Sequence, residues 1–520
     1  MSEAPQRQVA KAFQPGKRRS EPLLLRLLKP SLADCLFVAL LFILFASGAQ
    51  GWSSLLADGD TGWHIRTGQW ILSNHAVPTH DLFSFSKPQG QWFAWEWLAD
   101  LVFAWFFGVG GLKAVVLISA FLICLASVVL LRYTIWRGAN LAAAVLVILV
   151  FTDSARVHYL ARPHLFTLLL LPICLWILDK DRRHSHWTVW LLVPLTAIWT
   201  NLHGGFLALI ACLLIECACT AVRDFHDRHD RSWSQTRRYA ILTGLCGAAT
   251  LLNPYGLRLH QHLYEYLGSD WIVQAVDEFQ SPQFRSESMT RFEILLFCGL
   301  IFIPVFLWKR RYEDGSLILF WAHQALKSVR HVPLFGVVAT PAIGEEISQL
   351  WEKWSGAKPA NSTLGTLHSL FRDLTRHART TSLWVPAVFF ILWNTIPAGD
   401  WPKDFPVQQF PVALVNRNID RFKTDRLFTT DSWGGFLIYH VFPKGRVFMD
   451  GRSDFYGPDI AKDYIKAMDV RAGWREVLDK YEFRLALTPR DRALCEVLKT
   501  DPHWRVIDQD KLAVLFERSL

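Results

Sequence analysis

Two carboxylates that flank a glycine, Asp58 and Asp60, open the segment of this chain best equipped for chemistry. A tryptophan, a histidine and an arginine follow within two helical turns, at Trp63, His64 and Arg66. The segment comes just after the first long apolar run, so we expect it where a membrane helix meets water. A charge inside hydrocarbon is costly, whereas a carboxylate at the membrane edge can bind a cation or accept a proton. The alternative for the tripeptide alone is a solvated loop.

Further ionisable residues stand at the ends of later apolar runs. They are, in chain order, Asp153, Arg156, His158, Arg162, His203, Arg330 and His331. The alternation of spans described below puts all of them on the membrane face that carries Asp58 and Asp60. One cavity would explain these clusters together, so we predict that they bind a substrate, as do His64 and Arg66. For any single arginine or histidine, the alternative is an interfacial anchor.

The composition is that of a membrane protein with a soluble part attached. Of the 520 residues, 51% are hydrophobic and only 19% are charged, against about 25% charged residues in soluble domains. The net charge of +9 comes from Lys and Arg between apolar runs, as in cytoplasmic loops. We therefore expect no nucleic-acid partner. The cysteines show neither a disulfide framework nor a zinc-binding spacing.

Apolar runs long enough to form spanning helices fill residues 31–398, and we predict about eleven spans. They lie near 32–49, 111–131, 139–152, 163–179, 187–203, 205–222, 239–253, 291–308, 314–328, 331–344 and 382–398. Residues 1–30 form a basic tail, and residues 52–97 form a long, aromatic first outer loop. Connections rich in Lys and Arg alternate with the polar clusters. The positive-inside bias thus predicts a multi-pass protein of the inner (plasma) membrane with a cytoplasmic N-terminus.

Residues 399–520 regain charge and predict a small extracytoplasmic α/β domain. Its pattern favours strands over 426–430, 445–449, 483–488 and 512–516, and helices over 461–468, 474–481 and 491–500. We expect a largely parallel sheet. The stretch Asp450-Gly451-Arg452-Ser453-Asp454 follows one predicted strand, where such folds place ligand sites. The alternative is a structural turn with an internal Arg–Asp pair.

The first loop resembles that of the GT-C class of membrane glycosyltransferases, which use sugars carried on polyprenyl phosphate. The likeness is to oligosaccharyltransferase catalytic subunits and protein mannosyltransferases. There an acidic residue after the first span is followed by aromatic residues, then His or Asn, then Arg. Asp60, Trp63, His64 and Arg66 follow that order. The resemblance implies that Asp60, and with it Asp58, serves at the catalytic centre as base or metal contact.

The chain departs from that class in two places. Asp153 is a counterpart of the second-loop acidic motif, but no second Asp stands two residues away, which puts a two-site metal cage in doubt. The Trp-Trp-Asp-Tyr-Gly motif of the soluble domain is absent, and Asp431-Ser432-Trp433-Gly434-Gly435 is only a distant echo of it. Recognition of an asparagine sequon is therefore unsupported.

The resemblance implies transfer of a sugar from a polyprenyl-phosphate donor to a hydroxyl of a glycan, lipid or protein at the outer face of the membrane. Arg156, Arg162 and Arg330 are suitably sided for the leaving phosphate, and Asp60 for the base. Asp58 and Asp60 are candidate ligands for Mg²⁺ or Mn²⁺. Two other classes remain open. One is a transporter or lipid-handling protein without bond chemistry, and the other is a scaffold whose C-terminal domain binds a partner.

Overall fold

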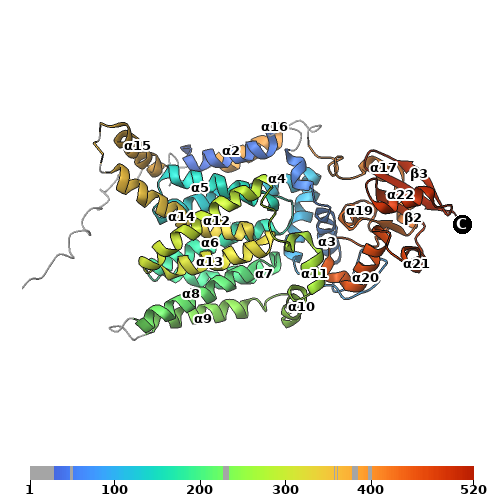
Figure 1. Cartoon of the computed structure of the whole chain (residues 1–520), viewed down its shortest axis with the longest axis horizontal. Coiled ribbons are helices and arrows are strands. Elements are labelled where there is room, and N and C mark those ends of the chain that lie inside the picture. The colour runs from blue at the N-terminus through green and yellow to red at the C-terminus, as the bar shows by residue number, and fades with distance from the viewer. Residues whose placement is uncertain are drawn as a thin grey trace, which may run out of the picture.

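The computed structural model describes residues 28–46, 51–226, 233–356, 358–359, 361–377, 384–395 and 401–519. The predicted cytoplasmic tail lies outside the described residues except at 28–30. The molecule is elongated, with a long helical bundle and a smaller C-terminal unit at one end of it (Figure 1). Helices α2 (Leu32–Ala46) and α16 (Trp384–Thr395) run along one side of the bundle, at the top in Figure 1.

Every one of the predicted spanning segments contains a helix. The stretches Trp97–Arg137, Leu141–His158, Phe206–His226 and Glu287–Trp308 are long and apolar enough to cross a membrane. The helices at the predicted spans are α2 (Leu32–Ala46), α4 (Trp97–Arg137), α5 (Leu141–Ser154), α6 (His164–Arg183), α7 (Leu192–Leu202), α8 (Phe206–His226), α9 (Ser234–Ala249), α12 (Glu287–Trp308), α13 (Tyr312–Lys327), α14 (Val332–Ser355) and α16 (Trp384–Thr395).

Helix α4 differs from the prediction, which began a span near residue 111 and left residues 98–110 outside it. The helix instead runs through both stretches and breaks at Gly110 and Gly111. Gly111 has a φ of +62°, a conformation that glycine adopts without strain. A side chain at Gly110 would collide with Trp393 of α16. The two glycines thus let one helix change direction where it leaves the bundle.

Charged side chains collect at both ends of the bundle. Helix α4 begins beside Glu96 and ends at Arg137, which pairs with Asp179 at 3.1 Å, Asp314 at 2.8 Å and Glu345 at 3.1 Å. These acidic partners flank the Lys- and Arg-rich connections that were predicted to lie inside. The polar clusters predicted to lie outside meet at the opposite end, beside the C-terminal domain. Which end faces the cytoplasm stays a prediction.

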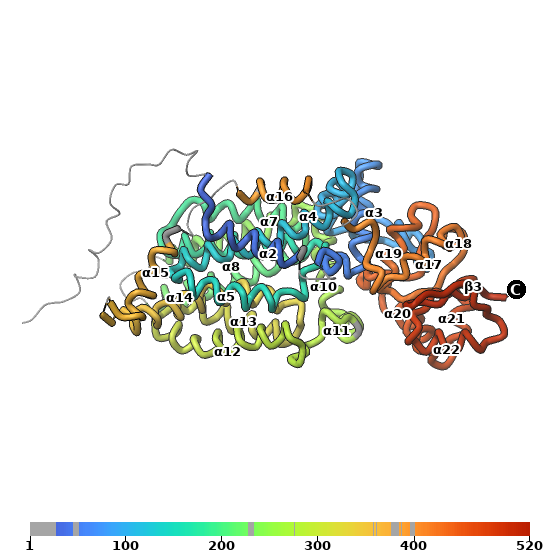
Figure 2. The backbone as a smooth tube through the Cα atoms, turned by 90° about the horizontal axis from the view of Figure 1, so that it is seen from above, coloured from blue at the N-terminus to red at the C-terminus, as the bar shows by residue number. Residues whose placement is uncertain are grey.

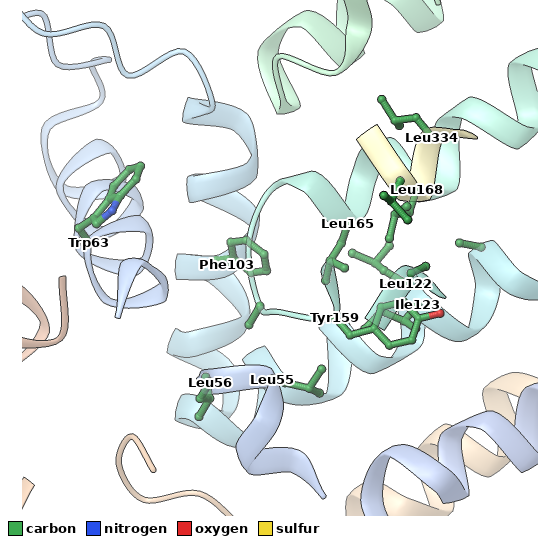
Figure 3. Close-up of a cluster of buried hydrophobic side chains, with 14 of the residues drawn as sticks. Leu55, Leu56, Trp63, Phe103, Leu122, Ile123, Tyr159, Leu165, Leu168 and Leu334 are labelled. Carbon is green, nitrogen blue, oxygen red and sulfur yellow. The ribbon is translucent and has the colours of Figure 1, made fainter. Parts of the chain in front are cut away.

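The first outer loop holds helix α3 (Asp60–Asn74), which has a largely buried face. This helix packs between α4 and the C-terminal domain. The apolar residues of this loop share one cluster with α4, α6 and α14, shown by Leu55, Leu56, Phe103, Leu165 and Leu334 in Figure 3. A second outer segment carries α10 (Leu257–Leu267) and α11 (Asp270–Ala275) at the same end of the bundle (Figures 1 and 2).

The C-terminal domain is an α/β unit, but its sheet is mostly antiparallel. The strands β1 (Leu427–Thr429), β2 (Leu485–Pro489), β3 (Trp504–Gln509) and β4 (Ala513–Arg518) lie in the order β1-β2-β4-β3. Only β1 and β2 are parallel, since β3 and β4 form a terminal hairpin whose first strand we did not predict. The helices are α17 (Val412–Arg417), α18 (Ile419–Thr424), α19 (Gly434–Val441), α20 (Ser453–Met468), α21 (Trp474–Lys480) and α22 (Ala493–Thr500).

The segment 445–449 was predicted to be a strand of this sheet, and that prediction is wrong. It lies extended against the first loop instead. Val447 donates its N–H to the Phe83 carbonyl at 2.9 Å and accepts from the Phe85 N–H at 3.0 Å. The backbone groups that a sheet would have paired thus join two segments far apart in the sequence.

Glycines let the first loop and the C-terminal domain approach backbone to backbone. A Cβ atom at Gly59 would lie 2.7 Å from the Ser432 carbonyl oxygen, and one at Gly435 would lie 2.7 Å from the Gly59 carbonyl carbon. A Cβ at Gly62 would be 2.9 Å from the Tyr439 Cβ. Arg66 donates to the Tyr439 carbonyl across the same contact. The domain is therefore docked on α3.

We expect Gly435→Ala to weaken this docking, because the added methyl meets backbone that cannot move aside. Overpacking of this kind costs about 1–3 kcal/mol. The thermal midpoint of the purified protein should fall, and protease should release the C-terminal domain sooner. Gly244→Ala in α9 is the matched control, since nothing lies within 4 Å of a Cβ there. Equal behaviour of the two variants would contradict the close approach.

Candidate active site

A cavity of about 820 Å³ lies between the first loop, the outer ends of the bundle helices, the α10–α11 segment and the start of α20. One part of its wall is apolar and comes from α6, α8, α13 and α14. The rest is polar and aromatic. The apolar part includes Leu168, Leu207, Ala211, Phe320 and Leu334, and the polar part includes Asp60, Glu96, His158, Arg162, His164, His203, Glu278, Arg330, His331 and Asp454.

Arg162 is the centre of the polar part. Its guanidinium contacts the Asp58 carboxylate at 2.7 Å, Glu278 at 3.0 Å and Asp60 at 3.3 Å. The carboxylates come from the first loop and from the segment after α11, while Arg162 stands just before α6. Three distant parts of the chain therefore meet around one guanidinium.

Asp60 begins α3, and its backbone N–H donates to the Asp58 carboxylate at 2.9 Å. The positive end of the helix dipole favours a carboxylate at this position. Burial nevertheless raises the pKa of Asp60 well above its usual range, and the neighbouring Asp58 raises it further, while Arg162 opposes both. Gly451 packs its backbone directly against the Asp60 carboxylate, where a side chain would not fit. Asp60 is thus a strongly basic carboxylate on the cavity wall.

Arg330 extends the positive region away from Asp60. It lies over the Phe279 ring at 4.5 Å, contacts the Tyr266 hydroxyl at 3.5 Å and approaches Glu278 at 3.9 Å. Burial alone would raise the pKa of Glu278, but Arg162 and Arg330 outweigh it and hold that pKa well below its usual range. Glu278 is therefore an ionised bridge between the two arginines.

Glu96 forms a second polar group beside the first. Its carboxylate lies 3.5 Å from His203 Nε2 and 4.0 Å from His64 Nε2. His64 is fully buried, and its other ring nitrogen is 2.6 Å from the Asp100 carboxylate. His203 accepts the Gly205 N–H at Nδ1, which leaves Nε2–H to face Glu96. Burial raises the pKa of Glu96 to about 8.

The arrangement does not fit a metal cage. Among the residues that the structure describes, no group of three or more His, Cys, Asp or Glu side chains is placed to hold a metal ion. Asp58 and Asp60 instead turn oxygen atoms toward the Arg162 guanidinium, which holds the place a cation would take. Their role as Mg²⁺ or Mn²⁺ ligands stays a prediction.

Most of the predicted site residues meet at the cavity. Asp60, His158, Arg162, His203, Arg330 and His331 line it. Asp58 contacts Arg162, which lines the cavity, and His64 lies 4.0 Å from the Glu96 carboxylate. Three predicted residues lie elsewhere: Arg66 binds the C-terminal domain, while Asp153 pairs with the exposed Arg156 at 3.5 Å and with Arg291 at 3.4 Å.

The sequence reasoning did not assign Glu96 or Glu278 to the site. Two features of the sequence could have pointed to them. Glu278 belongs to an acidic pair, Asp277-Glu278, in a connection between apolar runs, and Glu96 directly precedes a long apolar run. The stretch 450–454 contains the internal Arg–Asp pair of the second interpretation, and its role as a ligand site stays a prediction. Arg452 pairs with Asp450 at 2.7 Å and with Asp81 of the first loop at 2.9 Å, and the whole stretch lines the cavity. The strand expected before it is not formed.

The comparisons with known proteins concern the fold. No protein-family model and no curated protein sequence matches the chain. The archaeal oligosaccharyltransferase AglB from Archaeoglobus fulgidus, in complex with an inhibitory peptide and a dolichol-phosphate, is similar with a TM-score of 0.57 at 11% identity, over 88% of this chain and 69% of that chain. The chain shares the fold of this oligosaccharyltransferase. It is a membrane protein, as its apolar helices and this fold indicate.

Two further solved structures are similar to the chain. The Archaeoglobus fulgidus oligosaccharyltransferase tethered with an acceptor peptide containing the NVT sequon has a TM-score of 0.55 at 12% identity, over 88% of this chain and 68% of that chain. ArnT from Cupriavidus metallidurans bound to undecaprenyl phosphate has a TM-score of 0.47 at 12% identity, over 93% of this chain and 97% of that chain.

The raised pKa of Glu96 predicts a pH-dependent stability. Between the ordinary value of 4.5 and about 8, the folded protein holds a proton on Glu96 that the unfolded chain has lost. Stability therefore falls as pH rises through this window, by about 1 kcal/mol per pH unit. The glutamine of Glu96→Gln cannot ionise. The thermal midpoint of the variant, relative to that of the parent protein, should therefore rise as pH increases from about 5 to about 8. A difference that does not change with pH would contradict a buried, protonated Glu96.

Proposed function

We propose that the protein transfers a sugar from a polyprenyl-phosphate donor to an acceptor hydroxyl of a glycan, lipid or protein. The observation that carries the proposal is a single cavity that is lined both by Asp60, Arg162 and Arg330 and by apolar side chains of the bundle helices. A polyprenyl phosphate likewise combines a charged group, the phosphate, with a long apolar hydrocarbon chain. The fold agrees, because the similar Archaeoglobus fulgidus oligosaccharyltransferase is in complex with a dolichol-phosphate.

The apolar part of the cavity suits the first isoprene units of the lipid. Leu168 of α6, Leu207 of α8 and Phe320 of α13 contribute to it, and all three come from helices of the bundle. The lipid would enter between these helices, and its phosphate would meet Arg330 and the histidines at the helix ends. Hydrocarbon and phosphate are thereby each held by groups of matching polarity.

In the reaction that we infer, Asp60 accepts the proton of the acceptor hydroxyl. The acceptor oxygen forms the new bond to the anomeric carbon while the bond from that carbon to the phosphate oxygen breaks. The polyprenyl phosphate leaves with the electron pair, and Arg162 and Arg330 stabilise its growing negative charge. A single displacement of this kind inverts the anomeric centre. The raised pKa of Asp60 makes it a better proton acceptor than an exposed carboxylate.

We expect Asp60→Asn to lower sugar transfer by about 10²–10⁴-fold, the usual contribution of a general base. The assay incubates purified protein with a panel of polyprenyl-phosphate sugars and measures the lipid phosphate released, with Mg²⁺, with Mn²⁺ and with a chelator. Asp420→Asn is the matched control, because the Asp420 side chain is 94% exposed on the C-terminal domain. Normal turnover by Asp60→Asn would remove the proposed base. Lipid binding without turnover by the parent protein would favour the lipid-handling alternative.

We also infer that the cavity and the C-terminal domain lie on the extracytoplasmic side of the inner membrane, with the N-terminus in the cytoplasm. The support is the Lys- and Arg-rich set of connections at the far end of the bundle. A phosphatase reporter that is active only outside the cytoplasm, fused after the last residue, should be active. An inactive phosphatase together with an active cytoplasmic reporter at the same position would reverse this orientation.

A further inference from the structure

One wall of the cavity is aromatic and is not used by the proposed chemistry. Trp95 of the first loop and Tyr266 of α10 both line it, with their rings edge to face at 5.5 Å. Trp95 also meets the ring of His262 at 5.3 Å, and Phe93 stacks on the other side of His262 at 4.5 Å. Trp95 and Tyr266 are only partly buried, unlike Phe103 and the other aromatic residues of the core.

A carboxylate completes this wall. Asp454, at the start of α20, accepts a hydrogen bond from His262 Nε2 at 3.0 Å and lines the cavity. Its side chain is 12% exposed. The pair joins the C-terminal domain to α10, so the wall is built by three separate parts of the chain. An aromatic face beside a fixed carboxylate is how proteins hold a sugar, whose C–H face packs on the ring while its hydroxyls donate to the oxygen atoms.

The aromatic wall adjoins Arg330, which is proposed to bind the phosphate. The Tyr266 hydroxyl contacts Arg330 at 3.5 Å, and Trp95 is the neighbour of Glu96 in the chain. A ring joined to a phosphate at Arg330 therefore reaches the aromatic wall without leaving the cavity. The Asp454 carboxylate repels a second phosphate or an acidic sugar. The wall thus favours sugars that carry hydroxyl or amino groups and no negative charge.

We propose that Trp95, Tyr266 and the Asp454–His262 pair form the subsite for the sugar ring of the lipid-linked donor, and that they select neutral or amino sugars over acidic ones. This inference rests on the proposed function, because it assigns part of the same cavity to the sugar. Arg330 binds the phosphate that all donors share. The aromatic wall binds the part in which donors differ.

The test compares binding of two kinds of probe to the purified full-length protein by native mass spectrometry. The first kind is undecaprenyl phosphate, and the second is an undecaprenyl-phosphate sugar with a neutral, amino or acidic ring. The parent protein should bind the neutral or amino forms more tightly than the bare lipid phosphate. Trp95→Ala and Asp454→Asn should weaken sugar-form binding by about three- to tenfold and leave binding of the bare lipid phosphate unchanged. Trp95→Phe should keep most of the gain.

Two further variants separate the outcomes. Arg330→Ala should weaken both probes, and Trp187→Ala, at a tryptophan that is 65% exposed away from the cavity, should weaken neither. If Trp95→Ala weakens both probes equally, or if the parent protein gains nothing from the sugar, the subsite is overturned even where transfer occurs. If the sugar-dependent gain is present and lost in Trp95→Ala but the parent protein transfers nothing, the subsite stands and the proposed function fails.

Discussion

The end of the molecule that holds the cavity depends on how one arginine is neutralised. A buried guanidinium is unfavourable unless carboxylates replace its water, and removing one partner leaves a charge uncompensated. Arg162 finds Asp58, Asp60 and Glu278. These partners belong to segments far apart in the sequence, so their pairing helps to hold the first loop and the segment after α11 over the ends of the bundle helices. The cavity is the space that remains between them.

The same pairing explains why acid and base properties differ so strongly within a small volume. Glu278 lies between two arginines and stays ionised, whereas Glu96 faces neutral imidazoles and keeps its proton to about pH 8. Burial lowers the pKa of His203 to about 3, and Arg330 adds to that effect, so His203 serves Glu96 as a neutral donor. The neighbours of each side chain, and not its residue type, therefore decide whether it is charged or neutral.

Much of this could be predicted from the sequence, because apolar length locates helices and chain order assigns their ends to one side. That reasoning placed His158, Arg162, His203 and Arg330 at the same end of the bundle as Asp60. It could not fix the direction of a side chain, which depends on the rotation of its helix. Asp153 was therefore predicted to bind substrate in the same cavity as Asp60, yet it turns to Arg291. The hairpin of β3 and β4 was missed because β3 is largely exposed and lacks a clear alternation.

The glycines at the contact of α3 with α19 restrict which residues related proteins can have at these positions. Gly59, Gly62 and Gly435 lie so near opposing backbone that no larger residue fits on either side. Any descendant that retains this contact must hold small residues in both places at once, although hundreds of residues separate them in the chain. Asp-Gly-Asp-x-Gly early in a sequence and Trp-Gly-Gly late in it form a two-part signature by which distant kin could be recognised where overall identity has faded.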